Sequence, residues 1–375
     1  MQRYYKANLI SILLLLLLLA GCGQAQNKAA PPLVKPAKTE TDVWLTAKAG
    51  PITVKGKQLE GYSFTDYQPE SICGMTRWQD KLVVSEYREA AKNQPILLRA
   101  FNLDIQKGLL VPATDVLRQG ILSPATKQED AYTYPAADGA GYLYFRTYKG
   151  FRSYKGKALG PMDTTYGGAR LIIAADGKTA YALNKYLAAQ GTLENGLLTR
   201  CQNIDGQYVM PDFGILRSAA LGRGSNNNLY VTGFLKSQKP PRLALGIFTP
   251  QLTLLRLAES IPEEKVSETY QHASLQRLAV TDKYLLSWRL IDPEKASALF
   301  YLWNTEGRYL GKVPADQILG SLWQPREVTV WENNTLIIAA CKLTGQEQVE
   351  LGTGAKVRKV DRQIWTWHLF LVQLN

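Results

Sequence analysis

The stretch Ala169–Leu183, which reads Ala-Arg-Leu-Ile-Ile-Ala-Ala-Asp-Gly-Lys-Thr-Ala-Tyr-Ala-Leu, places a turn between two apolar runs. Asp176-Gly177 at its centre supplies residues that adopt positive φ readily, as a two-residue β-hairpin turn requires. The stretch therefore predicts a strand, a tight turn and a second strand.

The same pattern recurs along the chain. Six copies turn near residues 80, 138, 176, 227, 282 and 333, which gives a mean spacing of about 50 residues. A second hairpin follows five of the copies, with turns predicted at Asp104–Gly108, Lys155-Gly156, Asp205-Gly206, Thr249–Gln251 and Glu306-Gly307. Four strands per repeat, and no long amphipathic helix, predict an all-β fold, a six-bladed β-propeller of four-stranded blades.

The last repeat lacks a clear fourth strand, because the chain ends after Ile364–Leu374. The strand-like segment Ile52–Ser63 precedes the first repeat and has no partner there. We expect this N-terminal strand to complete the last blade and close the ring, which would leave no edge strand open to aggregation. A β-sandwich with irregular loops is the alternative fold.

The N-terminus carries a targeting segment. Arg3 and Lys6 precede the apolar run Leu9–Ala20, which is shorter than the roughly 20 residues of a membrane-spanning helix. The run ends in Leu19-Ala20-Gly21-Cys22. This tetrad resembles the bacterial lipoprotein signal, in which a peptidase cuts before the cysteine and the thiol carries a diacylglycerol. The resemblance implies a signal peptide over residues 1–21 and lipidation of Cys22, and an ordinary signal peptide with a chance cysteine is the alternative.

Residues 22–42 are rich in Ala, Pro, Lys and Gln and show no apolar period. We interpret them as a flexible tether with a reach of about 25 Å, followed by a monomeric propeller domain over residues 43–375. Gly23 rather than Asp follows the cysteine. The lipoprotein resemblance then implies an extracytoplasmic, lipid-anchored protein, on the outer membrane if the cell has two membranes and otherwise on the outer face of the plasma membrane.

The pattern from Trp44 to Asn375 resembles the six-bladed propeller lipoproteins of bacterial envelopes, in the broad TolB-like and NHL-like group. The resemblance concerns repeat number and spacing. The chain has no series of WD dipeptides, no kelch Gly-Gly series and no clean NHL consensus. No functional residue therefore carries over from that group.

The formal net charge is +12, which favours an anionic partner or serves solubility alone. For an exported protein we expect an envelope protein or an anionic envelope polymer as partner, and no nucleic acid. Connections between blades carry acidic residues such as Glu263 and Glu264, which would give an acidic channel mouth with a basic surround. The basic residues of the connections within blades form the candidate surface for an anionic partner: Lys236, Lys239, Arg242, Lys356, Arg358, Lys359 and Arg362.

Reactive side chains are sparse. Beyond Cys22 the cysteines are Cys73, Cys201 and Cys341, an odd number that predicts no complete disulfide framework, although one pair among them is an alternative. The chain has two histidines, and it lacks a nucleophile elbow, a phosphate loop, a zinc-binding His-Glu-x-x-His motif and an EF-hand loop. We therefore predict no catalytic residue, no metal site and no cofactor from motifs.

Two functions remain open. The favoured one is a binding or scaffold module anchored in the bacterial envelope. The alternative is a propeller-type enzyme, a lyase, lactonase or glycan-active hydrolase, with its site at the channel mouth. Fold alone decides neither, because propellers perform both roles.

Overall fold

The strands of the computed structural model form four four-stranded antiparallel sheets and one nine-stranded sheet. A single parallel bridge between β2 and β6 joins two four-stranded antiparallel units within the larger sheet. These two units and the four separate sheets are called blades 1 to 6 here. The structure describes residues 43–88, 96–113, 133–147, 150–156, 158–163, 170–174, 176–183, 187–205, 218–221, 227–235, 242–251, 253–261, 277–292, 297–351 and 358–375. The predicted signal peptide and tether, Cys22 included, lie outside these ranges. Residues Thr41–Asn375 make up one compact unit.

Blades 1 to 3 each consist of four consecutive strands. They are β3 (Ile72–Trp78), β4 (Lys81–Tyr87), β5 (Ile96–Asp104) and β6 (Leu109–Pro112) in blade 1, β7 (Thr133–Ala137), β8 (Leu143–Arg146), β9 (Phe151–Lys155) and β10 (Ala158–Asp163) in blade 2, and β11 (Arg170–Ile173), β12 (Thr179–Leu183), β13 (Leu187–Glu194) and β14 (Leu197–Asp205) in blade 3.

Blades 4 and 5 repeat this order, and blade 6 differs in its fourth strand. The strands are β15 (Ser218–Leu221), β16 (Leu229–Leu235), β17 (Arg242–Phe248) and β18 (Leu254–Leu257) in blade 4, β19 (Leu278–Val280), β20 (Tyr284–Asp292), β21 (Ser297–Asn304) and β22 (Tyr309–Pro314) in blade 5, and β23 (Gln324–Glu332), β24 (Thr335–Leu351), β25 (Arg358–Leu374) and β2 (Ile52–Asp66) in blade 6. A short strand, β1 (Leu45–Ala49), pairs with β2, and one helical turn, α3 (Asp316–Leu319), follows β22.

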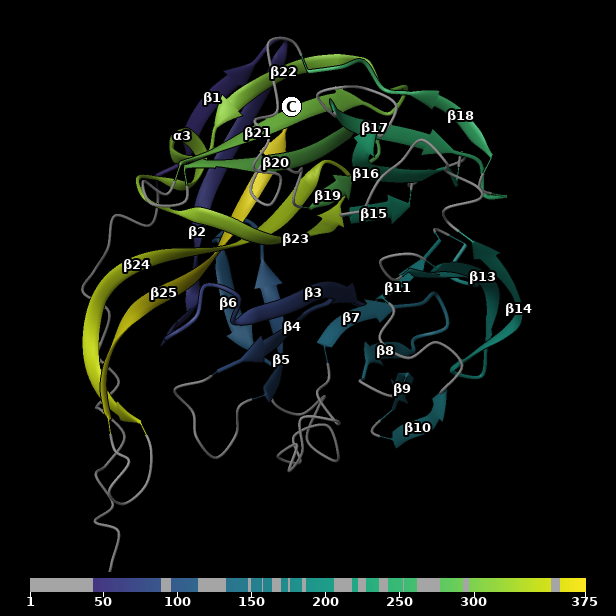
Figure 1. Ribbon diagram of the computed structural model, residues 1–375, viewed down its shortest axis with the longest axis horizontal. Coiled ribbons are helices and arrows are strands. Elements are labelled where there is room, and N and C mark those ends of the chain that lie inside the picture. Colours follow the sequence, from purple (N-terminus) through teal and green to yellow (C-terminus); the bar gives the residue numbers. More distant parts are fainter. Residues whose placement is uncertain are drawn as a thin grey trace, which may run out of the picture. The chain divides into compact units, whose positions relative to one another are not determined.

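The first strand of each blade lies at the centre of the domain (Figure 1). These strands contact one another in the cyclic order β3, β7, β11, β15, β19, β23 and back to β3. A closed ring of first strands is the arrangement of a six-bladed propeller, and two stacked layers of a sandwich would not produce it. The prediction of an all-β fold is therefore confirmed, and the six turns predicted between first and second strands all separate those strands.

Two predicted turns differ from the structure. In blade 3, β13 and β14 turn at Asn195 and Gly196, which both have positive φ, and Asp205 is the last residue of β14. The prediction of a turn at Asp205-Gly206 was wrong, because Asn-Gly also supplies the left-handed backbone of a tight turn and lies ten residues earlier. The loop at Asp176-Gly177 is also longer than two residues, since Ala174 N–H donates to the Thr179 carbonyl across it.

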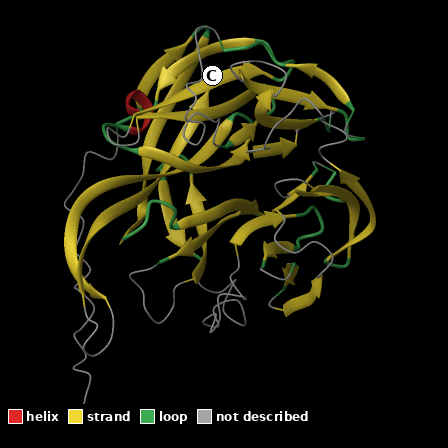
Figure 2. Cartoon of the chain, in the orientation of Figure 1, coloured by secondary structure: helices red, strands yellow, loops and turns green. Residues whose placement is uncertain are grey.

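Arg358, Lys359 and Arg362, which the sequence places in a connection within a blade, instead belong to a strand of a long hairpin. β24 and β25 pair continuously from Thr335↔Gln373 to Leu351↔Arg358, with one register shift near Gly345. Figure 2 shows this pair of strands extending away from the other blades. The polar side chains at alternate positions give this segment the composition of a loop. Only the pairing of β24 with β25 shows that it is a two-stranded ribbon.

The strand β2 lies between blade 6 and blade 1. It pairs antiparallel with β25 from Val54↔Leu374 to Asp66↔Trp365, with a register shift after Gln58. On its other side it makes a single parallel bridge to β6, in which Glu60 N–H donates to the Gly108 carbonyl at 2.9 Å. Apolar side chains of β2 also pack between the two blades, where Tyr62 and Phe64 share a buried cluster with Trp367.

No helix in the described part of the chain has both the length and the apolar character to cross a bilayer.

Candidate functional site

Polar side chains from five of the six blades meet at one end of the central channel. Every first strand begins at this end, because each one runs toward the turn that leads to the second strand. The side chains are Cys73 of β3, Tyr134 of β7, Arg170 of β11, Arg277 directly before β19, and Glu327 of β23. We call these five residues the channel-end cluster.

An ion pair joins two members of the channel-end cluster. The Arg277 Nε donates to both carboxylate oxygens of Glu327, each at 3.0 Å. Glu327 is buried, with 9% of its side chain exposed, whereas 24% of the Arg277 side chain is exposed. Hydrogen bonds of this charge-assisted kind are stronger than neutral ones, so the pair holds β19 and β23 in a defined orientation.

Aromatic stacking holds a second arginine of the channel-end cluster. The guanidinium of Arg170 lies over the Tyr134 ring at 3.7 Å from its centre, and that of Arg146, at the end of β8, lies 5.3 Å from the same ring. Tyr134 has a φ of 50°, a left-handed value that a non-glycine residue adopts at a cost of about 1–3 kcal/mol. The register of β7 and β8 shifts between Thr133 and Ala136, so a β-bulge aims this ring at the arginines.

A glycine provides the space for Tyr134. Gly74 has a φ of 153°, and a Cβ at this position would lie 2.9 Å from both the Tyr134 Cα and the Pro135 Cδ. Only a residue without a side chain permits this approach of β3 to β7.

Burial and charge act on the titratable groups of the channel-end cluster. Burial lowers the pKa of Arg170 below its ordinary value, and the nearby positive charge of Arg277 adds to this effect. Burial opposes the charge of Arg277 as well, but the Glu327 carboxylate outweighs it and raises the pKa of Arg277. Burial, with the negative charge of Glu327, raises the pKa of the Cys73 thiol to about 12. Cys73 is therefore protonated at neutral pH and is a poor nucleophile.

A cavity adjoins the channel-end cluster within the ring of first strands. Its volume is about 270 Å³, and its lining includes Ala136, Ile172, Ala279 and Val330 from four different blades. On each of these strands, the first residue that lines the cavity lies within three positions of the residue that belongs to the channel-end cluster. The channel therefore has a charged end next to a small space with mostly apolar side chains.

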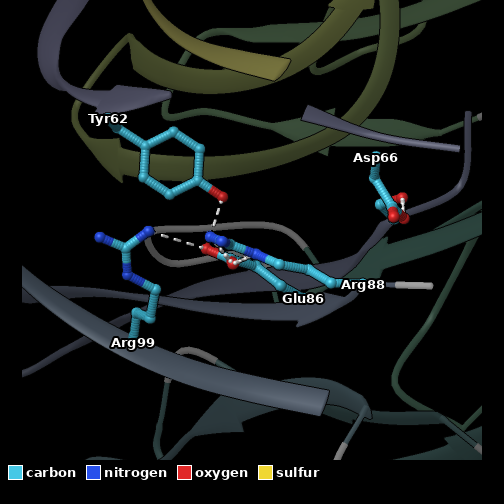
Figure 3. Close-up of polar contacts among 6 residues, drawn as sticks. Tyr62, Asp66, Glu86, Arg88 and Arg99 are labelled. Atoms are coloured by element: carbon cyan, nitrogen blue, oxygen red, sulfur yellow. Dashed lines mark hydrogen bonds and ion pairs between the residues drawn. The ribbon is translucent and has the colours of Figure 1, made fainter. Parts of the chain in front are cut away.

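A second polar cluster lies between β2 and blade 1 and is shown in Figure 3. The Glu86 carboxylate, fully buried, accepts hydrogen bonds from the Tyr62 hydroxyl at 2.9 Å and from the Arg88 Nε at 2.7 Å. Arg99 completes the group at 3.4 Å. Arg88 and Arg99 also lie over the rings of Phe64 and Tyr62. We call Tyr62, Glu86, Arg88 and Arg99 the junction cluster, because it links β2 to β4 and β5 beneath packed aromatic rings.

Most of the basic side chains predicted to form an anionic-partner surface lie outside the part of the chain that the structure describes. Lys236, Lys239 and Lys356 lie outside the described residues, as do the side chains of Arg242 and Arg358. The two residues whose side chains are described, Lys359 and Arg362, lie on the ribbon of β24 and β25 rather than in a loop.

The ribbon carries charges of both signs. Arg362 lies over the Tyr67 ring, and the Tyr67 hydroxyl donates to the Glu347 carboxylate at 3.2 Å. Gln348 pairs with Asp361 across the two strands. Glu263 and Glu264, expected at an acidic mouth, lie outside the described residues.

Sequence reasoning missed Arg170, Arg277 and Glu327. Arg170 is the first residue of a predicted first strand, and Arg277 directly precedes another, so their repeat positions were available as a signal. The contacts between blades were missing from this signal, because Tyr134 and Arg170 lie 36 positions apart and Arg277 and Glu327 lie 50 apart, and each pair meets only when the ring closes. Sequence spacing does not encode that meeting.

Metal-ligand and disulfide chemistry find little support in the described residues. No group of three or more His, Cys, Asp or Glu side chains is placed to hold a metal ion within the parts of the chain that the structure describes. Cys73, Cys201 and Cys341 are free thiols.

Comparison with known proteins gives no family. No protein-family description matches the chain, and no curated protein matches it. A solved gluconolactonase from Xanthomonas campestris is 14% identical, with a TM-score of 0.47 over 91% of this chain and 99% of that one. A solved putative gluconolactonase is 11% identical, with a TM-score of 0.43 over 84% of this chain and 92% of that one. The calcium-binding protein regucalcin from Agrobacterium tumefaciens is 10% identical, with a TM-score of 0.41 over 73% and 83% of the two chains. These structures are also propeller-like, but at such scores the assignment of six blades rests on the strand pairing described above.

Proposed function

We propose that this protein is a lipid-anchored, extracytoplasmic β-propeller that binds a ligand of the bacterial cell envelope at the end of its channel. The observation that carries the proposal is the channel-end cluster, in which two arginines, a glutamate and a strained tyrosine from four blades converge beside a cavity. Polar groups that converge beside a concave space are a common feature of small-molecule sites.

The anchor belongs to the same proposal. The segment Leu19–Cys22 supports cleavage before Cys22 and its lipidation, and two acyl chains hold a protein stably at a membrane. Residues 22–42 would let the domain stand off the lipid surface, on the outer membrane of a cell with two membranes and otherwise on the outer face of the plasma membrane.

We also propose that β2 serves as the closing strand of the ring. Its pairing with β25, its bridge to β6 and the junction cluster support this role. The tether precedes β1, which pairs with β2. A pull on the lipid anchor would therefore act first on the segment that holds blades 6 and 1 together.

Crosslinking in intact cells tests the binding function. The full-length protein, carrying a photoreactive amino acid in place of Ile172 in the cavity lining, is irradiated and its adducts are identified by mass spectrometry. We expect a defined adduct that the same substitution at the exposed Leu255 of β18 does not give. Equal adducts at both positions, or none at either, would contradict a channel site.

The second candidate is a propeller-type enzyme, a lyase, lactonase or glycan-active hydrolase. The observation in its favour is a buried carboxylate, Glu327, at the end of a channel cavity, where a general base would be positioned. Turnover of a lactone panel by the purified protein, lost on Glu327→Gln, would favour the enzyme over the binding module.

A further inference from the structure

We propose that the channel-end cluster binds the carboxylate group of a small organic acid, with Arg170 as the group that pairs with the ligand. The uncharged part of the acid would occupy the adjoining cavity. This inference rests on the proposed binding function and specifies the chemical class of the ligand.

The balance of charge points to an anionic ligand. Glu327 pairs with Arg277 through both carboxylate oxygens. No carboxylate among the described residues lies within ion-pair distance of Arg170, which contacts the ring and the hydroxyl of Tyr134 and feels Glu327 only at longer range. Arg170, Arg277 and Glu327 together carry a net charge of +1, and Arg146 adds a second positive charge 5.3 Å from the same Tyr134 ring. Because excess positive charge away from bulk water is unfavourable, an anion would stabilise the site.

The orientation of Arg170 suits a carboxylate. A guanidinium that stacks on an aromatic ring keeps its N–H donors in its own plane, so they remain free to pair with a planar acceptor at the edge. A carboxylate accepts two such donors side by side. The strained backbone of Tyr134, next to Gly74, holds the stacking ring in place before any ligand arrives.

The buried Glu327 carboxylate disfavours a dianion such as phosphate relative to a monoanion at neutral pH. Like charges in a partly desolvated site repel, and a doubly charged group is repelled about twice as strongly as a singly charged one at the same distance. The carboxylate therefore fits the site better than a phosphate group does.

The cavity limits the size of the acid. Its volume of about 270 Å³ lies just below the range of about 300–1,000 Å³ for typical small-molecule sites. Ala136, Ile172, Ala279 and Val330 offer apolar side chains, but most of the exposed lining surface is polar. The lining also includes Arg77 and the threonines Thr76 and Thr329. A short acid with an uncharged body matches such a space.

Isothermal titration calorimetry on the full lipidated protein in detergent micelles tests the inference. The probes are the straight-chain acids from acetate to octanoate, their hydroxylated forms, the matching neutral amides, and inorganic phosphate. We expect at least one acid to bind with a Kd below about 10 mM, and its amide to bind about 10- to 100-fold more weakly, as befits loss of a charged hydrogen-bonded pair.

Variants assign the binding to the channel-end cluster. Arg170→Gln should weaken the acid by about 10- to 100-fold, whereas Arg256→Gln on the exposed surface of β18 should leave it unchanged. Glu327→Gln should raise the affinity for phosphate relative to the acid, because the repelling charge is gone. Thermal unfolding of Arg170→Gln serves as the folding control, and we expect a Tm equal to or above that of the wild type, since a disfavoured positive charge is removed.

Three outcomes overturn the inference. Phosphate binding more tightly than every acid, or acid and amide binding equally, would contradict a carboxylate site while leaving a channel binding site intact. If none of the acids binds but a crosslinked adduct still forms in cells at position 172, the carboxylate ligand is rejected and the channel binding site is retained. Absence of both would reject the binding function itself.

Discussion

Replacing Glu86 by glutamine should destabilise the domain more than any other single loss of a carboxylate in the described structure. Its side chain is fully buried and accepts from Tyr62, Arg88 and Arg99. Removing one partner of a buried ion pair costs about 3–5 kcal/mol. Arg88 and Arg99 retain side-chain exposures of 22% and 32%, so water can partly solvate them, and we expect a loss of about 2–4 kcal/mol in the free energy of unfolding.

Urea unfolding of the full-length protein at pH 7 measures this loss, with the m-value unchanged. The matched control is Glu332→Gln, since Glu332 makes an ion pair with Arg77 at 3.9 Å with both side chains more than a third exposed. An exposed pair of this kind contributes about 0–1 kcal/mol. Tyr62→Phe removes only the hydroxyl donor and should cost about 1.5–3 kcal/mol, and the double variant should show coupling between the two sites.

The position of the junction cluster adds a local readout. Tyr62 belongs to β2, whereas Glu86 and Arg99 belong to β4 and β5, so Glu86→Gln should speed hydrogen exchange of the β2 amides more than that of the β20 amides. A loss below about 1 kcal/mol, or one no larger than that of Glu332→Gln, would refute the reasoning that this buried cluster holds blade 1 to β2.

Three further predictions concern separate parts of the chain. Burial lowers the pKa of His368 to about 4, against about 6.5 in an unfolded chain. The folded state thus favours the neutral ring, and stability should fall by about 2 kcal/mol as the pH drops from 7.5 to 4.5; urea midpoints at the two pH values should show this slope in the wild type and a smaller one in His368→Gln. Gly74→Ala should cost about 1–3 kcal/mol in thermal unfolding and weaken acid binding, because its Cβ would displace Tyr134; an unchanged Kd would argue against the stacking role of that ring. Cys22→Ser should abolish palmitate labelling and release the protein from the membrane fraction, and retention of label would disprove lipidation at this residue.

The fold was largely predictable because its signals are local. Asp-Gly and Asn-Asn turns between short apolar runs predict hairpins, and their spacing of about 50 residues predicts the number of blades. The errors have local causes as well. Asn195-Gly196 competes with Asp205-Gly206 as a turn, and the polar alternation of β24 and β25 resembles a loop until the two strands pair.

The candidate site was not predictable, because it exists only between blades. Arg170 stacks on Tyr134 from the preceding blade, and Arg277 pairs with Glu327 from the following one. Neither pair has a characteristic spacing, since the loops between first strands vary in length. The sequence by itself determined the repeat and the number of strands in each blade, because turn chemistry and apolar periodicity act over a few residues. Only the tertiary structure decided which charges meet at the channel end and that β2 bridges to β6 as well as pairing with the last blade, because closing the ring brings together residues that are dozens to hundreds of positions apart.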